Sequence, residues 1–373
     1  MGRAAPPAAA AAEPAAAAPA AEPTADAAAA AAEAAALIES CSRSHALPDG
    51  RELAYVDCGG AGSRGTVLFL HPVQGNRLMA LALHRPAAEL GLRVIAPDRP
   101  GYGASSPHPG RTVASFAADL AVLLKALGVA RVGVLGSSAG SMYAFALARN
   151  PETAPIVAGR VTLLPPWLPP SSLPDGHGVP WPLRLLSAAP VAAAAAFVGA
   201  GNALVLWRLR GGDVRVADIM TRSTPLEVAA FERDPLNDHF YRAMINEWSR
   251  PGAASAIAEE MLLCAEAGAR RRLGFAFSEA AAAGAGARVF AGGDDPLVPA
   301  ARVRAWAEAA NGGAAAEEAA AGAAAARGGN GGASGRGGGG QPVELVVVEG
   351  GTHDGVFHTH KRAALEALAA ELA

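Results

Sequence analysis

Residues 132–148 read VGVLGSSAGSMYAFALA, and Gly136-Ser137-Ser138-Ala139-Gly140 lies between a short apolar run and a longer one. The short run predicts a buried strand, and the longer segment predicts a helix. A serine at the centre of G-x-S-x-G between a strand and a helix is typical of a nucleophile elbow. So tight a turn requires small residues two positions before and after Ser138. The sequence therefore predicts that Ser138 presents its hydroxyl at the carboxyl end of a strand.

Short apolar runs alternate with longer amphipathic segments on both sides of this stretch. Strands are predicted at residues 51–58, 66–71, 93–97, 131–135, 159–164, 287–291 and 343–348, and helices at 78–90, 112–127, 139–149, 300–310 and from 356 onward. Alternation at this spacing requires crossover connections, which predicts an α/β fold with a mostly parallel sheet.

The alternation stops at Pro165-Pro166 and resumes near residue 287. The sequence between them is rich in Pro, Trp and Ala and has helical stretches without a clear strand. We therefore predict one core domain, formed by residues 42–164 and 271–373, that is interrupted by a helical cap at 165–270. Within the cap, residues 186–207 carry no charge. Pro190 and two glycines favour buried or hinge-like helices there over a membrane span, while an apolar lid surface stays open as an alternative.

Two further segments have biased composition. Of the first 36 residues, 23 are Ala and 5 are Pro, so we predict a disordered tail at residues 1–41. Between residues 311 and 341, 12 of 31 residues are Gly, and this segment is predicted to be a flexible insert. It lacks the lysine and the strand–helix setting of a phosphate-binding loop.

A serine hydroxyl needs a base to remove its proton and a third group to orient that base. After the strand predicted at 287–291 come Asp294 and Asp295, and after the strand at 343–348 comes His353. Ser138, this acid and this histidine all follow strand ends, where open α/β sheets bind their ligands. Asp294 stays open as the acid, and His358 or His360 as the histidine.

In this order, these motifs resemble the α/β-hydrolase superfamily, and within it the lid-bearing, serine esterase-like hydrolases. The resemblance is carried by HPVQGNR (71–77), APDRPGYGASSP (96–107), GSSAG (136–140), GGDDPLVP (292–299) and GGTHDG (350–355). It implies that Ser138 is the nucleophile and His353 the general base and acid. By the spacing to Pro299 in such relatives, it implies that Asp295 orients His353.

The resemblance also implies an oxyanion hole built from two backbone N–H groups. One belongs to Ala139, directly after the nucleophile. The other comes from the loop after the strand at 66–71, where relatives have His-Gly and this chain has His71-Pro72. Because proline has no N–H group, we predict Val73 as the second donor. His71, Asp98 and Arg99 are interpreted as residues that order loops.

Composition narrows the classes of function. The net charge is −3 and no basic block occurs, which argues against nucleic-acid binding. Three cysteines without C-x-x-C spacing (Cys41, Cys58 and Cys264) argue against a disulfide framework and a zinc cluster. No motif calls for a metal or an organic cofactor. Without a secretory hydrophobic region or a basic transit segment, the sequence favours a cytoplasmic location.

The sequence thus favours a serine hydrolase that forms an acyl-enzyme on Ser138 and cleaves a carboxylic ester or related acyl compound, with a hydrophobic small-molecule substrate. Epoxide hydrolases and haloalkane dehalogenases are disfavoured, because such relatives have Asp where this chain has Ser138. Acyl transfer, C–C bond hydrolysis and hydroxynitrile lysis stay open. So does a ligand receptor that turns over slowly or not at all.

Membrane contact through the cap is not favoured but stays open. Trp167, Trp181 and Trp207 are interpreted as core residues of the cap.

Overall fold

An eight-stranded sheet forms the centre of the computed structural model, which describes residues 24–172, 190–212, 214–220, 224–265, 273, 286–312 and 342–373. The strands are β1 (Ser42–Ala46), β2 (Glu52–Gly59), β3 (Gly65–Leu70), β4 (Leu92–Pro97), β5 (Val132–Ser138), β6 (Val161–Pro166), β7 (Ala287–Gly292) and β8 (Glu344–Val348). All seven predicted strands are present. β1 was not predicted, because SRSHA is a polar edge strand without an apolar run.

The strand order is β1-β2-β4-β3-β5-β6-β7-β8. β2 runs antiparallel to both β1 and β4, and every other neighbouring pair is parallel. The sheet is therefore mostly parallel, as predicted. The parallel strands bring their carboxyl ends to one edge, where the loops after β3, β5, β7 and β8 meet.

Successive residues of β3 supply both hydrophobic layers. Val67 and Phe69 pack in one layer with the last helix, α14 (Gly355–Leu372), and with the short helices η1 (Arg77–Leu83) and α2 (His84–Glu89). Leu68 and Leu70 pack in the other layer with α3 (Val113–Ala126), α4 (Gly140–Arg149) and a helix that covers residues 300–312. A strand buried on both faces explains why TVLFL is continuously apolar.

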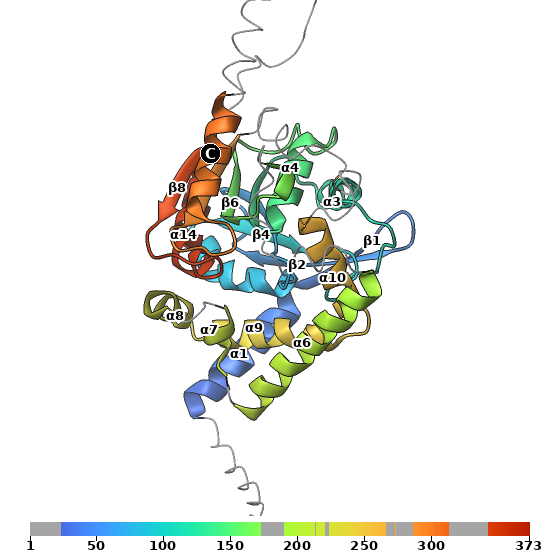
Figure 1. The fold of residues 1–373 in the computed structure, drawn as a ribbon, viewed down its shortest axis with the longest axis vertical. Coiled ribbons are helices and arrows are strands. Elements are labelled where there is room, and N and C mark those ends of the chain that lie inside the picture. Colours follow the sequence, from blue (N-terminus) through green and yellow to red (C-terminus); the bar gives the residue numbers. More distant parts are fainter. Residues whose placement is uncertain are drawn as a thin grey trace, which may run out of the picture.

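The cap is inserted between β6 and β7. Its described helices are α6 (Val191–Gly211), α7 (Val216–Met220), α8 (Pro225–Glu232), α9 (Leu236–Asn246), η3 (Glu247–Ser249) and α10 (Ala253–Cys264). Figure 1 shows α6, α7, α8 and α9 gathered on one side of the sheet. The helical nature of the insertion is as predicted. Residues 173–189, most of 266–285, and 313–341, where most of the predicted flexible insert falls, lie outside the described residues.

The prediction of a disordered tail over residues 1–41 is wrong for its last part. Ala25–Cys41 form the helix α1, which Thr24 caps by accepting a hydrogen bond from the N–H of Ala27. α1 packs against α9, with Leu37 and Ile38 against the core. Alanine has the highest helix propensity, so an alanine-rich segment forms a helix when one of its faces packs against another part of the protein. Residues 1–23 lie outside the described residues.

The prediction of buried or hinge-like helices near residues 186–207 is wrong for α6. Pro190 begins one uninterrupted helix of 21 residues, long and apolar enough to cross a membrane, yet only 22% of its most apolar window is buried. Phe197, Leu204 and Trp207 are 73%, 55% and 64% exposed. The residues that bury α6 against α10 are small or medium in size, so the larger apolar side chains remain on the outer face.

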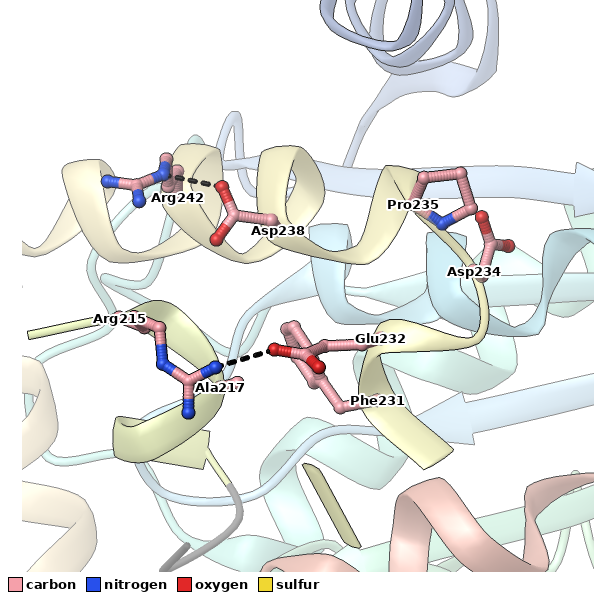
Figure 2. Close-up of a pocket in the computed structure, with 8 residues that line it drawn as sticks. All are labelled: Arg215, Ala217, Phe231, Glu232, Asp234, Pro235, Asp238 and Arg242. Atoms are coloured by element: carbon pink, nitrogen blue, oxygen red, sulfur yellow. Dashed lines mark hydrogen bonds and ion pairs between the residues drawn. The ribbon is translucent and has the colours of Figure 1, made fainter. Parts of the chain in front are cut away.

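Charges on the outer surface of the cap pair with one another. Figure 2 shows Arg215 bonded to Glu232, at 2.8 Å between guanidinium and carboxylate, beside a second pair formed by Arg242 and Asp238. These side chains line a surface hollow of about 170 Å³ between α7, α8 and α9. Solvated ion pairs of this kind contribute little to the free energy of folding, so they do little to fix the position of the cap on the core.

Two carboxylates of the cap, the buried Glu260 and the partly exposed Glu247, form ion pairs with the core. Glu260 of α10 is fully buried and accepts hydrogen bonds from Arg111 at 2.8 Å and Tyr143 at 2.9 Å. Burial alone would raise the pKa of Glu260, but Arg99 and Arg111 hold that pKa below its usual value. Glu247 of η3 accepts two hydrogen bonds at 3.0 Å from Arg77, which follows β3.

We expect Glu260→Gln to destabilise the protein by about 3–5 kcal/mol, because Arg99 and Arg111 would remain buried without a full counter-charge. Urea unfolding followed by tryptophan fluorescence measures the change. Glu232→Gln is the matched control, since Glu232 is a cap carboxylate that pairs with Arg215 at the surface and its side chain is 51% exposed. Equal losses for the two variants would contradict this account.

Candidate active site

Ser138 ends β5 on a strained turn. Its φ of +50° makes it the single described residue other than glycine with positive φ. Such a conformation costs about 1–3 kcal/mol and persists only where the surroundings enforce it. α4 begins two residues later, at Gly140. The turn thus holds the Ser138 hydroxyl at the carboxyl edge of the sheet, as the G-x-S-x-G pattern predicts.

The two glycines of GSSAG allow close contacts between backbones. A Cβ on Gly140 would lie 2.1 Å from the carbonyl oxygen of Leu70, and a Cβ on Gly136 would lie 2.9 Å from the backbone of Gly140. No side chain fits at either position without moving a neighbouring backbone. The first turn of α4 therefore lies directly against the end of β3.

The loops after β7 and β8 are bonded to each other. The N–H of Gly293 donates to the carbonyl of Val348 at 2.8 Å, and the N–H of Asp294 donates to that of Gly351 at 3.0 Å. A Cβ on Gly292 would lie 2.4 Å from the carbonyl oxygen of Gly351. The paired glycines in GGDD and GGTH thus let the two loops lie side by side.

The structure brings Ser138, His353 and Asp295 into one chain of hydrogen bonds. The Nε2 atom of His353 lies 2.8 Å from the Ser138 hydroxyl, and its Nδ1 atom lies 2.7 Å from Oδ2 of Asp295. The other oxygen, Oδ1 of Asp295, accepts from the N–H groups of Leu297 and Val298 at 2.8 and 3.0 Å. The carboxylate is thereby fixed in place, and all three side chains are buried.

The alternative candidates lie elsewhere. Asp294 is exposed, whereas Asp295 is 4% exposed and bonded to His353. His358 packs among the rings of Phe231, Tyr241 and Phe357, and burial holds its pKa well below the usual value. His360 has its Nδ1 atom 2.9 Å from the hydroxyl of Thr359, beside it in the sequence. The geometry therefore favours Asp295 and His353 over these alternatives.

The loop after β3 carries the predicted second N–H donor. Arg99 orders this loop, because its guanidinium donates to the carbonyl of His71 and, at 2.7 Å, to that of Pro72. The N–H of Arg99 also donates to Nε2 of His71. Val73 follows at once and lines the same cavity as Ser138, while Ala139 is fully buried at the start of α4. The loop-ordering interpretation of His71 and Arg99 thus fits the contacts.

An apolar cavity of about 340 Å³ opens over Ser138. The side chains that line it are mostly large and apolar: Val73, Trp167, Ile219, Met220, Trp248, Met261 and Leu297. Trp167 and Trp248 donate their indole N–H groups to the carbonyls of Cys264 and Gln74, at 3.0 and 2.9 Å. Each ring is thereby satisfied at its polar end and presents its apolar body to the cavity.

Several residues of the site were not predicted. Trp248, Met220 and Met261 reach the cavity from cap segments that carry no motif. The cap tryptophans also differ from one another: Trp167 lines the cavity, Trp207 is exposed, and Trp181 lies outside the described residues. Glu227, a buried cap carboxylate like Glu260, contacts Thr352 next to His353. A single glutamate in a helix gives no signal of such a contact.

Gly140→Ala should abolish correct folding around Ser138, because the new methyl group would overlap the Leu70 carbonyl. We expect a large fall in the thermal midpoint and in the yield of soluble protein. Gly201→Ala is the matched control, since nothing lies within 4 Å of a Cβ at that helical position. It should leave stability unchanged or raise it by up to about 1 kcal/mol. A Gly140→Ala variant as stable as the parent protein would contradict the packing argument.

The comparisons with known proteins agree with this architecture. Residues 65–201 match the family model described as alpha/beta hydrolase fold. A comparison with curated proteins finds no match.

Many solved structures are similar in fold, and those described below are 17–20% identical in sequence. An esterase from Exiguobacterium antarcticum is 17% identical, with 88% of this chain and 98% of that one covered at a TM-score of 0.57. Epoxide hydrolase A from Mycobacterium thermoresistibile is 20% identical, with 88% and 97% covered at 0.56. The enol-lactonase from Burkholderia xenovorans LB400 is 18% identical, with 88% and 99% covered at 0.53. The chain therefore has the α/β-hydrolase fold.

Proposed function

We propose that the protein is a serine hydrolase that cleaves carboxylic esters through an acyl-enzyme on Ser138. The observation that carries the proposal is the chain of hydrogen bonds from Ser138 through His353 to Asp295, at 2.8 and 2.7 Å. A hydroxyl bonded to an imidazole, which is itself oriented by a buried carboxylate, is the arrangement that makes serine nucleophilic.

The steps follow from this geometry. His353 accepts the proton of Ser138 as Oγ attacks the ester carbonyl, and the N–H groups of Ala139 and Val73 stabilise the oxyanion. His353 then donates the proton to the leaving alcohol, which departs as the acyl-enzyme forms. Water, deprotonated by His353, attacks the acyl carbon. Release of the acid returns the proton to Ser138. Asp295 keeps Nδ1 of His353 in the donor state throughout.

The cavity over Ser138 favours an apolar acyl or alcohol group. Its lining includes two tryptophans, two methionines and branched aliphatic side chains. Methionine adapts its shape to irregular apolar surfaces, which suits a site that accepts more than one acyl chain. A volume of about 340 Å³ is within the range of small-ligand sites and favours short to medium chains.

The same three residues also serve acyl transfer, lactone opening and C–C bond hydrolysis. The neighbours with solved structures include an esterase, an enol-lactonase and epoxide hydrolases, so the fold alone does not select among these reactions. Hydrolysis of an ester, cyclic or open-chain, is preferred over acyl transfer because it needs nothing beyond the three residues, the two N–H groups and water.

Ser138→Ala should reduce hydrolysis of p-nitrophenyl butyrate and octanoate by about 10⁴-fold or more. Asp295→Asn should cause a loss of similar size, because His353 would lose its orienting carboxylate. Asp294→Asn is the matched control and should retain the parent rate. Initial rates at 400 nm measure all three variants. A parent protein no faster than Ser138→Ala, together with ligand binding seen as a raised thermal midpoint, would favour a receptor instead.

A second candidate function, contact with a lipid surface, is favoured by the outer face of α6. Phe197, Leu204 and Trp207 lie seven and three residues apart, which places them on one face of the helix. Arg208 and Arg210 follow in the last turn. An apolar face with an aromatic ring and basic residues at one end is suited to lie in the interface of an anionic bilayer. We propose reversible contact of this kind for a protein that otherwise acts in the cytoplasm.

Co-sedimentation with vesicles of phosphatidylcholine and phosphatidylglycerol tests this contact. We expect binding by the parent protein that is lost when Phe197, Leu204 and Trp207 are all replaced by Ser. Leu226→Ser is the matched control, because Leu226 is 65% exposed but lies on α8. Equal binding by the parent and the triple variant would exclude α6 as the contact.

A further inference from the structure

We propose that Glu227 of the cap is a positioning residue for His353, so that the triad is complete only when the cap is seated on the core. This inference rests on the proposed function of Ser138 and His353. It concerns a carboxylate that belongs to α8, outside both core segments, and that has no part in the chemical steps derived above.

Glu227 contacts the backbone directly before His353. Its Oε1 atom accepts hydrogen bonds from the N–H of Thr352 at 2.7 Å and from the hydroxyl of Thr352 at 2.9 Å. Its Oε2 atom lies 3.0 Å from the same hydroxyl, so the single hydroxyl proton is shared by both oxygens. Glu227 is 1% exposed and Thr352 is 8% exposed. Hydrogen bonds to a buried carboxylate are stronger than those between neutral groups.

The contact extends to the backbone after His353. The N–H of Gly355 donates to the Thr352 hydroxyl at 3.3 Å. A Cβ on Gly355 would lie 1.7 Å from Cδ of Glu227, so the side chain of Glu227 occupies the space that any other residue at position 355 would need. Glu227 is therefore packed against the chain on both sides of His353, at positions 352 and 355.

The location of Glu227 explains how the fold accommodates a carboxylate there. Gly355 is the first residue of α14, an 18-residue helix, and helix N-termini favour negative charge. Glu227 itself lies in the first turn of the cap helix α8, which is capped by Thr224. The two ring nitrogen atoms of His353 are thus bonded to Ser138 and Asp295, while Glu227 holds the residue before it, Thr352.

The consequence is a link between the cap and the reactivity of Ser138. A displacement of α8 away from the core removes the acceptor of the Thr352 N–H and frees the loop that carries His353. A shift of about 1 Å in a catalytic group lowers rates by about 100-fold even when its chemistry is unchanged. A cap seated over bound substrate therefore holds the base in position, whereas a displaced cap leaves the nucleophile weakly activated.

Kinetics of p-nitrophenyl butyrate hydrolysis test this role. We expect Glu227→Ala to lower kcat by about 10- to 100-fold with little change in KM, and to slow labelling of Ser138 by a fluorophosphonate by a similar factor. Glu227→Gln keeps an acceptor for the Thr352 N–H and should restore most of the rate. Thr352→Val removes the shared hydroxyl alone and should give an intermediate loss, which covers the case that Glu227→Ala fails to fold.

Glu232→Ala is the matched control, because Glu232 is a carboxylate on the same helix that faces Arg215 at the surface (Figure 2). It should retain the parent kcat. An unchanged kcat and labelling rate in Glu227→Ala, a change confined to KM, or an equal loss in Glu232→Ala would each overturn the proposal.

A readout that needs no substrate separates this proposal from the proposed function. The Nδ1–H proton of His353, bonded to Asp295, is followed by proton NMR in the full-length protein and assigned by its loss in His353→Gln. We expect the resonance to shift or broaden in Glu227→Ala and to persist in Glu232→Ala. If the parent protein cleaves no ester, the ester hydrolase proposal fails while this resonance still decides the role of Glu227. An identical resonance in the parent and in Glu227→Ala overturns it.

Discussion

The contact between Gly140 and the carbonyl of Leu70 is the constraint on which the site depends. The absence of a side chain at position 140 lets the start of α4 lie against the end of β3. A Cβ at this position would lie only 2.1 Å from the Leu70 oxygen. With α4 fixed there, the chain between β5 and α4 has too little length for an ordinary turn, and Ser138 adopts a φ of +50°. The position of the Ser138 hydroxyl then dictates where His353 and Asp295 have to lie.

Carboxylates of the cap bind three core segments, one of which carries His353. Glu247 binds Arg77 in the segment after β3, Glu260 binds Arg111 in the segment after β4, and Glu227 binds Thr352 after β8. A buried carboxylate is costly unless its partners are well placed, so the contacts of Glu260 and Glu227 tolerate few arrangements of cap and core. Directional bonds of this kind define how the cap sits more narrowly than apolar contact alone, because dispersion and burial have little directional preference.

The sequence was most informative where local chemistry determines local structure. The elbow at Ser138, the choice of strands and the positions of Asp295 and His353 after strand ends all follow from short motifs and from the order of elements, and the structure agrees with each of them. The errors lie where a partner distant in the sequence decides the outcome. The alanines of α1 become helical because α9 offers them a surface, and α6 is exposed because its partner α10 covers only one side.

Trp248 and Glu227 show the same limit within the site. Neither lies in a motif, and both act through contacts with core loops that are more than 100 residues away along the chain: Gln74 for Trp248 and Thr352 for Glu227. The core supplies the reacting groups and can be identified from its own sequence. The cap supplies the apolar walls of the cavity and the support of the His353 loop, and it does so through contacts that no short pattern encodes. The same insertion lines the cavity and contacts the His353 loop, so under the proposed function a displacement of the cap would affect both substrate binding and the position of His353.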